Sequence, residues 1–132
     1  MYDVVVVGGG PAGLSAALVL GRCRRRVLLY DEGEPRNKAS HAVHCLLGHE
    51  GTDPSELLAK GRAELRRYAT ITSRRGRVTN IVPSGKHFSV TCAAGQVSEG
   101  RKVLLTTGLA DQVPQLAGIE KFYGRSVHHC PY

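Results

Sequence analysis

The chain has 132 residues, of which 42% are hydrophobic and 22% are charged, so it is long enough for one globular domain with a sizeable core. Its formal net charge is +7, but no aromatic residues are interleaved with its densest arginine cluster, at residues 22–26, which favours a solvated basic surface over a nucleic-acid site. The apolar run from Val4 to Leu20 lacks a basic start and is interrupted at residues 8–11 by three consecutive glycines and a proline, which argues against a secretion signal and a membrane-spanning helix.

The N-terminal residues predict a strand–helix–strand unit. The valine-rich run Tyr2–Val7 does not alternate with polar residues, which is typical of a strand buried on both faces of a parallel sheet. We expect a helix from Pro11 to about Arg24, with small residues where it approaches the sheet. A second buried strand, Val27–Tyr30, then ends at Asp31, which completes a βαβ unit.

The next stretch, Glu32–Gly51, shows no sustained helical or strand period. A loop of this length in a compact domain usually has a function. It gathers three histidines and a cysteine, but no second cluster of ligands lies elsewhere, so we predict no metal site. The four cysteines of the chain are widely spaced and no signal peptide precedes them, so we expect a cytoplasmic protein with reduced thiols.

The second half of the chain predicts a helix from Pro54 to Tyr68, which Thr52 or Asp53 can cap, and then a β-meander. The apolar run Val103–Leu105 indicates that the parallel sheet resumes after the meander. We expect Leu109–Tyr132 to be a loop. The fold class is therefore α/β: a Rossmann-like parallel sheet with an antiparallel three-strand β-meander. The strands expected in this half are Arg77–Val82, His87–Cys92 and Val97–Glu99 of the meander, and Val103–Leu105 of the parallel sheet.

Residues 8–13 match the GxGxxG pattern between a predicted strand and a predicted helix. In this pattern Gly8 permits the tight turn, Gly10 lets the backbone approach a pyrophosphate, and Gly13 allows close packing of helix and strand. Asp31 lies 18 residues after Gly13, close to the position where an acidic residue binds a ribose hydroxyl in this kind of motif. Such a residue argues against a 2′-phosphate, so FAD or NAD is favoured over NADP here. The predicted cofactor-binding residues of this region are Gly8, Gly10, Pro11, Ala12, Gly13 and Asp31.

The order of the elements, with Thr106-Thr107-Gly108 after the last strand, resembles the FAD domain of the two-dinucleotide-binding flavoproteins. That family more often has Ala-Thr-Gly at this place. The segment Gly124–Tyr132 is similar to the approach to the redox motif of low-molecular-weight thioredoxin reductases and related dithiol oxidases. The resemblance implies that Cys130 is the first cysteine of a Cys-x-x-Cys pair. It also implies cofactor contacts by Arg36, Asn37, Gly48, His49, Thr107 and Gly108.

This resemblance implies the FAD-binding portion of a thioredoxin-reductase-like enzyme, which passes electrons between a nicotinamide (NADPH or NADH), FAD and a thiol or disulfide substrate. Residues 1–115 would form the FAD-binding domain, and residues 116–132 a connector to a nicotinamide and redox domain. Two alternative functions are a dithiol oxidase that uses oxygen and a non-catalytic dinucleotide-binding module. The sequence is also compatible with a homodimer. Because the second cysteine and a second dinucleotide site are absent, we expect these 132 residues alone to be inactive. The resemblance also implies that a later C-terminal segment covers the flavin, so we expect these residues alone to retain FAD weakly or not at all.

Overall fold

The structure, a computed structural model, describes residues 1–128. The chain divides into two compact units. The first comprises Met1–Gly33 and Leu58–Gly108, and the second comprises Glu34–Leu57 and Leu109–Tyr132.

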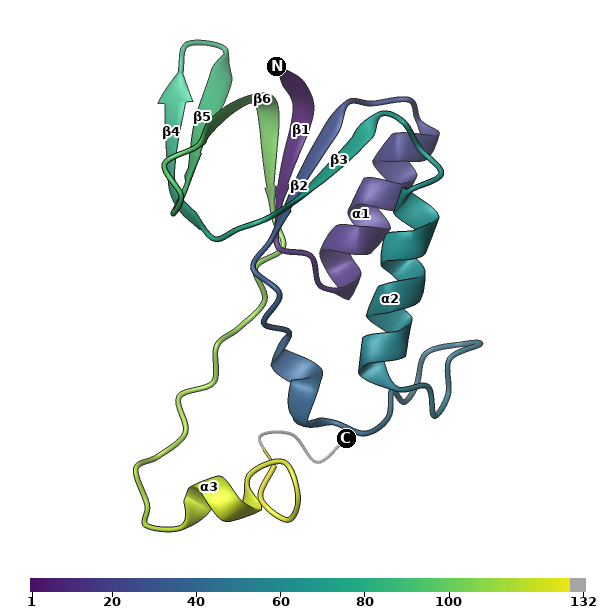
Figure 1. Cartoon of the computed structure of the whole chain (residues 1–132), viewed down its shortest axis with the longest axis vertical. Coiled ribbons are helices and arrows are strands. Elements are labelled where there is room, and N and C mark those ends of the chain that lie inside the picture. The colour runs from purple at the N-terminus through teal and green to yellow at the C-terminus, as the bar shows by residue number, and fades with distance from the viewer. Residues whose placement is uncertain (129–132) are drawn as a thin grey trace. The chain divides into compact units, whose positions relative to one another are not determined.

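The first unit is built on a six-stranded mixed sheet with the order β3-β2-β1-β6-β5-β4. Strands β3, β2, β1 and β6 are parallel to one another, whereas β5 is antiparallel to both of its neighbours, β6 and β4 (Figure 1). The elements are β1 (Tyr2–Val7), α1 (Pro11–Arg22), β2 (Val27–Asp31), α2 (Pro54–Leu65), β3 (Ile71–Arg75), β4 (Val78–Ser84), β5 (His87–Cys92) and β6 (Val97–Leu105).

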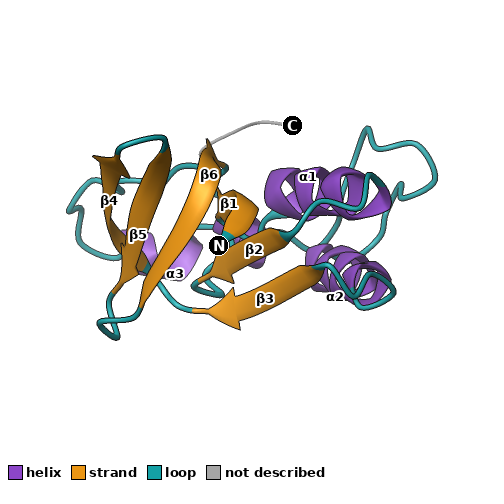
Figure 2. Cartoon of the chain, turned by 90° about the horizontal axis from the view of Figure 1, so that it is seen from above, coloured by secondary structure: helices purple, strands orange, loops and turns teal. Residues whose placement is uncertain are grey.

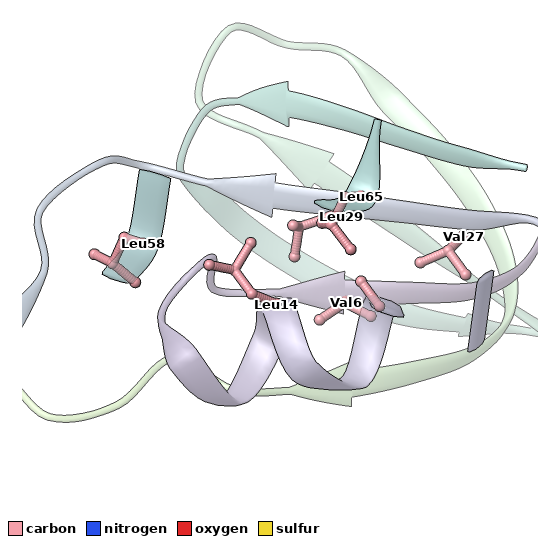
Figure 3. Close-up of a cluster of buried hydrophobic side chains, with 7 residues drawn as sticks. Val6, Leu14, Val27, Leu29, Leu58 and Leu65 are labelled. Carbon is pink, nitrogen blue, oxygen red and sulfur yellow. The ribbon is translucent and has the colours of Figure 1, made fainter. Parts of the chain in front are cut away.

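Helices α1 and α2 lie side by side against one face of the parallel strands (Figure 2). Every second residue of β1 and β2 points to this face, as the two-residue period of a strand requires. Their side chains meet α1 and α2 in a cluster that excludes water and stabilises the unit (Figure 3). The buried members of this cluster are Val6, Leu14, Ala17, Val27, Leu29, Leu58 and Leu65.

The β-meander covers the opposite face of the parallel strands. The alternate residues of β1 and β2 pack here against β5, in a second buried cluster of Val5, Val7, Leu28, Tyr30, Val90 and Cys92. The Tyr30 hydroxyl forms a buried hydrogen bond with Ser98 Oγ at 3.0 Å, and Arg74 Nη1 donates to the same oxygen at 3.2 Å. Because both faces are covered, β1 and β2 carry the continuous apolar runs that the sequence shows.

The predicted α/β fold is confirmed, but two details of the sheet were wrong. The strands expected at Val97–Glu99 and Val103–Leu105 are one continuous strand, β6, which pairs first with β5 and then with β1. Gly100 is paired with both neighbours, and a Cβ on it would lie 2.6 Å from Val5 Cγ2. A glycine thus permits the close approach of β1 where the strand changes partners.

Strand β3 (Ile71–Arg75) was not predicted. It pairs with β2 on one side only and forms an edge of the sheet. Its sequence, ITSRR, is mostly polar, as edge strands often are. It therefore has neither the continuous apolar run nor the clear alternation of apolar and polar residues on which the other strand predictions depend.

Both long helices end earlier than expected. Helix α1 stops at Arg22 because Arg24 adopts a left-handed conformation with φ +56°. Helix α2 stops at Leu65, and the amide of Tyr68 donates to the Leu65 carbonyl at 3.0 Å in a tighter turn. No helix within the described residues is long and apolar enough to cross a membrane.

The second unit contains two short helices in stretches predicted to be irregular. The 3₁₀ helix η1 spans Arg36–Ala39, and the single-turn α3 spans Ile119–Phe122. The first turn of α2 also belongs to this unit. There Asp53 Oδ1 accepts hydrogen bonds from the amides of Ser55 (2.7 Å) and Glu56 (3.3 Å), which is the capping that the sequence predicted.

Candidate nucleotide-binding site

The turn between β1 and α1 follows the carboxyl end of the central strand β1 (Figure 1). Gly8 has φ +111°, a conformation that side chains disfavour. A Cβ on Gly8 would lie 2.2 Å from the Thr106 carbonyl oxygen, and a Cβ on Gly13 would lie 1.8 Å from the Gly8 carbonyl oxygen. Both glycines are thus required for the close packing of the turn, the helix and the end of β6.

Thr106 fastens this turn to the end of β6. Its amide donates to the Val7 carbonyl at 2.9 Å. Its hydroxyl lies within hydrogen-bonding distance of the carbonyl oxygens of Val7 (3.0 Å) and Gly8 (2.9 Å). Thr106 was not among the predicted site residues, although it is the first residue of the Thr-Thr-Gly segment that the sequence shows. These hydroxyl contacts explain how threonine can stabilise the turn at a position where alanine is more frequent in the family.

Gly10 is different from the other glycines of the motif. A Cβ on it would have no heavy atom within 4 Å, so the space beside its backbone is open. Gly10 is the N-cap of α1, and no side chain caps the helix or places an acidic group in its first turn. The unpaired amides and the positive end of the helix dipole therefore remain available to an anion at this position.

Asp31 ends β2 beside the turn. Its Oδ1 accepts a hydrogen bond from the Gly33 amide at 2.9 Å, and its Oδ2 accepts one from Arg62 Nη2 at 3.0 Å. A Cβ on Gly9 would lie 2.3 Å from the Asp31 carboxyl carbon. The absence of a side chain on Gly9 therefore lets the carboxylate lie directly against the turn, which is where the sequence predicted a ribose-binding acid.

Thr107 and Gly108 follow β6 and are exposed. Gly108 has φ +67°, and a Cβ on it would have no heavy atom within 4 Å. The first unit therefore brings together the predicted residues of the GxGxxG turn, Asp31 and the Thr-Gly segment at the carboxyl ends of β1, β2 and β6.

The remaining predicted contacts belong to the second unit. Arg36 forms a bidentate ion pair with Asp111, with Nε to Oδ2 at 2.9 Å and Nη2 to Oδ1 at 2.7 Å. This pair is partly exposed and links η1 to the segment before α3. Asn37 lies in η1, where its carbonyl accepts a hydrogen bond from the Ser40 amide at 3.0 Å.

Gly48 and His49 lie in a loop closed by Val43, whose amide donates to Thr52 at 2.8 Å and whose carbonyl accepts from Gly51 at 2.8 Å. Gly48 has φ +80°. His49 Nδ1 is buried and makes no hydrogen bond to the described residues.

The same loop contains an ion pair between His44 Nδ1 and Glu50 Oε1 at 2.6 Å. The hydrogen bonds from His44 and from the Cys45 amide hold the pKa of Glu50 below its usual range. His44 therefore has a local partner, and His49 Nδ1 is buried. No group of three or more His, Cys, Asp or Glu residues within residues 1–128 could hold a metal ion.

Within the described residues, Cys23, Cys45 and Cys92 are free thiols; the first two are exposed and the third is buried. The predicted redox residue, Cys130, lies outside the described residues. The geometry of the first unit is that of a dinucleotide-binding domain, with a glycine-rich turn, a free helix N-terminus and an acid at the end of the second strand.

Comparison with known proteins agrees with this class. The family model for pyridine nucleotide-disulphide oxidoreductases matches residues 2–131, and the chain belongs to that family. It is 39% identical to a probable thioredoxin reductase of Arthroderma benhamiae over 99% of this chain and 34% of that protein.

Solved structures show the same fold. An oxidoreductase from Agrobacterium tumefaciens superposes with a TM-score of 0.93 at 41% identity, over 99% of this chain and 44% of that one. A putative thioredoxin reductase from Bacillus anthracis superposes with a TM-score of 0.92 at 31% identity, over 98% and 44%. The chain thus spans less than half the length of these relatives.

Proposed function

We propose that this chain is the FAD-binding portion of a flavin-dependent disulfide oxidoreductase of the thioredoxin-reductase type. The observation that carries the proposal is the β1–α1 turn, where Gly10 leaves open space in front of an uncapped helix N-terminus. A pyrophosphate fits such a place, because the amides can donate to its oxygens and the dipole favours its charge. Family membership supports a flavin and a nicotinamide as the cofactors.

The donor and acceptor groups of the first unit fit FAD. The turn with Gly8, Gly10 and Gly13 would hold the pyrophosphate, and the Asp31 carboxylate would accept hydrogen bonds from the adenosine ribose. Thr107 and Gly108 would border the cofactor. For Arg36, Asn37, Gly48 and His49, the resemblance to the family alone supports cofactor contacts. When bound, FAD would supply the two-electron redox chemistry, and this chain would bind and orient it.

The reaction that we propose for the whole protein passes electrons between NADPH or NADH, the flavin and a thiol or disulfide substrate, in the cytoplasm. Cys130 would be one of the two thiols that such a reaction needs, since one sulfur forms a mixed disulfide and a second resolves it. Residues 1–115 would serve as the FAD-binding domain and residues 116–132 as the connector.

Replacing Asp31 by alanine tests the proposed ribose contact. We expect FAD to bind more weakly by about 1.5–3 kcal/mol, the range for hydrogen bonds to charged groups. The measurement is a fluorescence titration of FAD into each purified variant.

Glu32→Ala is the matched control, because it removes a neighbouring carboxylate that is more exposed and lies 3.7 Å from Arg77. That variant is expected to bind FAD like the unmodified chain. Equal dissociation constants for Asp31→Ala and Glu32→Ala would show that the ribose is held elsewhere.

A further inference from the structure

The partner of the Asp31 carboxylate is Arg62, a residue of α2 that lies 31 positions away in the sequence. Leu58 and Leu65, one turn to either side of Arg62, are each only 3% exposed and belong to the buried cluster between the helices and the parallel strands. The backbone that carries Arg62 is therefore fixed by packing. Its guanidinium, by contrast, is partly exposed and reaches the end of β2 at the edge of the proposed nucleotide site.

The Asp31 carboxylate can accept further hydrogen bonds beyond those that it makes within the protein. An ionised carboxylate accepts about four hydrogen bonds, two on each oxygen. The Gly33 amide takes one position on Oδ1, and Arg62 takes one position on Oδ2. One position on each oxygen remains, and a ribose with free 2′ and 3′ hydroxyls has two donors to fill them.

Charge gives Arg62 a second effect on the same site. The Asp31 carboxylate lies against Gly9 of the phosphate-binding turn, so it would repel the negative pyrophosphate that the turn is proposed to bind. A guanidinium 3.0 Å from Oδ2 offsets this repulsion without removing the acceptor oxygens. The turn and the carboxylate can then bind the same ligand, the turn through its pyrophosphate and the carboxylate through its ribose.

We propose that Arg62 is a positioning residue of the nucleotide site, which holds and neutralises Asp31 so that this carboxylate selects an adenosine ribose with free hydroxyls. The inference rests on the proposed function. Arg62 acts through Asp31, so its contribution depends on the ribose hydroxyls and not on the rest of the ligand.

The experiment measures dissociation constants for ADP and 2′-deoxy-ADP by calorimetry, with the full chain and its Arg62→Ala and Arg62→Lys variants. We expect Arg62→Ala to weaken ADP by about three- to tenfold, the size of one partly exposed ion pair. It should weaken 2′-deoxy-ADP distinctly less. Arg62→Lys should restore most of the ADP affinity, because the ammonium keeps the positive charge.

Arg66→Ala is the matched control, since it removes an exposed arginine just beyond the end of α2. It should leave both dissociation constants unchanged. An equal loss for ADP and 2′-deoxy-ADP in Arg62→Ala would indicate a merely structural role and overturn the inference, as would the absence of any loss.

The two levels of the proposal fail differently. If the unmodified chain does not bind ADP, which needs only the β1–α1 turn and Asp31, the proposed function is wrong and the role of Arg62 falls with it. If Asp31→Ala weakens ADP but Arg62→Ala does not, the nucleotide site stands and only the inference about Arg62 is contradicted.

Discussion

Replacing Gly10 by valine is expected to abolish FAD binding while the chain remains folded. A side chain at this position meets no heavy atom of the protein within 4 Å, and the backbone φ of −73° is accessible to valine. The added atoms would instead occupy the space in front of the α1 N-terminus where we propose that the pyrophosphate binds. The loss of affinity should exceed about 100-fold, because both the backbone contacts and the dipole interaction are prevented.

Thermal unfolding and FAD titration together test this expectation. Ala94→Val is the control, since it also introduces a valine side chain, but in an exposed turn between β5 and β6. It should bind FAD normally. A Gly10→Val variant with unaltered FAD affinity would show that the pyrophosphate does not lie at this turn.

Replacing Gly13 by alanine is expected to destabilise the fold itself. A Cβ there would lie 1.8 Å from the Gly8 carbonyl oxygen and 2.8 Å from Thr106 Oγ1. The first obstacle is backbone, so α1 must move away from the turn and the hydrogen bonds of Thr106 are strained. We expect a loss of about 3 kcal/mol or more in the free energy of unfolding, measured by urea denaturation.

Gly61→Ala is the control for this variant. It also adds a Cβ to a helical glycine, but the nearest atom is Leu14 Cδ1 at 3.0 Å, the end of a side chain that can turn aside. The higher helix propensity of alanine offsets part of that contact. If Gly13→Ala unfolds at the same urea concentration as Gly61→Ala, then the tight packing of the turn does not limit stability.

The strongest local patterns of the sequence predicted the fold best. The bounds expected for Tyr2–Val7 and His87–Cys92 are those of β1 and β5, because one strand is apolar throughout and the other alternates clearly. Strand β3 lacks such a pattern, since it lies at an edge and pairs only with β2. The continuity of β6 was hidden by Gly100 and its charged neighbours, whose place in the strand depends on pairing with β1 and β5.

The sequence predicted only those residues of the candidate site that belong to a local motif. The spacing of the glycines and of Asp31 follows from a βαβ unit and is visible in the sequence. The parts contributed by Thr106 and Arg62 depend on contacts across 98 and 31 positions. Neither residue belongs to the motif, so only the fold could bring them to Gly8 and Asp31.

Titration of FAD into the unmodified chain, followed by displacement with ADP, tests the central claim most directly. Because we expect these 132 residues to hold FAD only weakly, calorimetry at high FAD concentration should show weak but saturable binding of one FAD per chain, which excess ADP suppresses by competing for the turn after β1. Heat signals that do not saturate, or bound FAD that excess ADP does not displace, would contradict the assignment of this turn as the FAD pyrophosphate site.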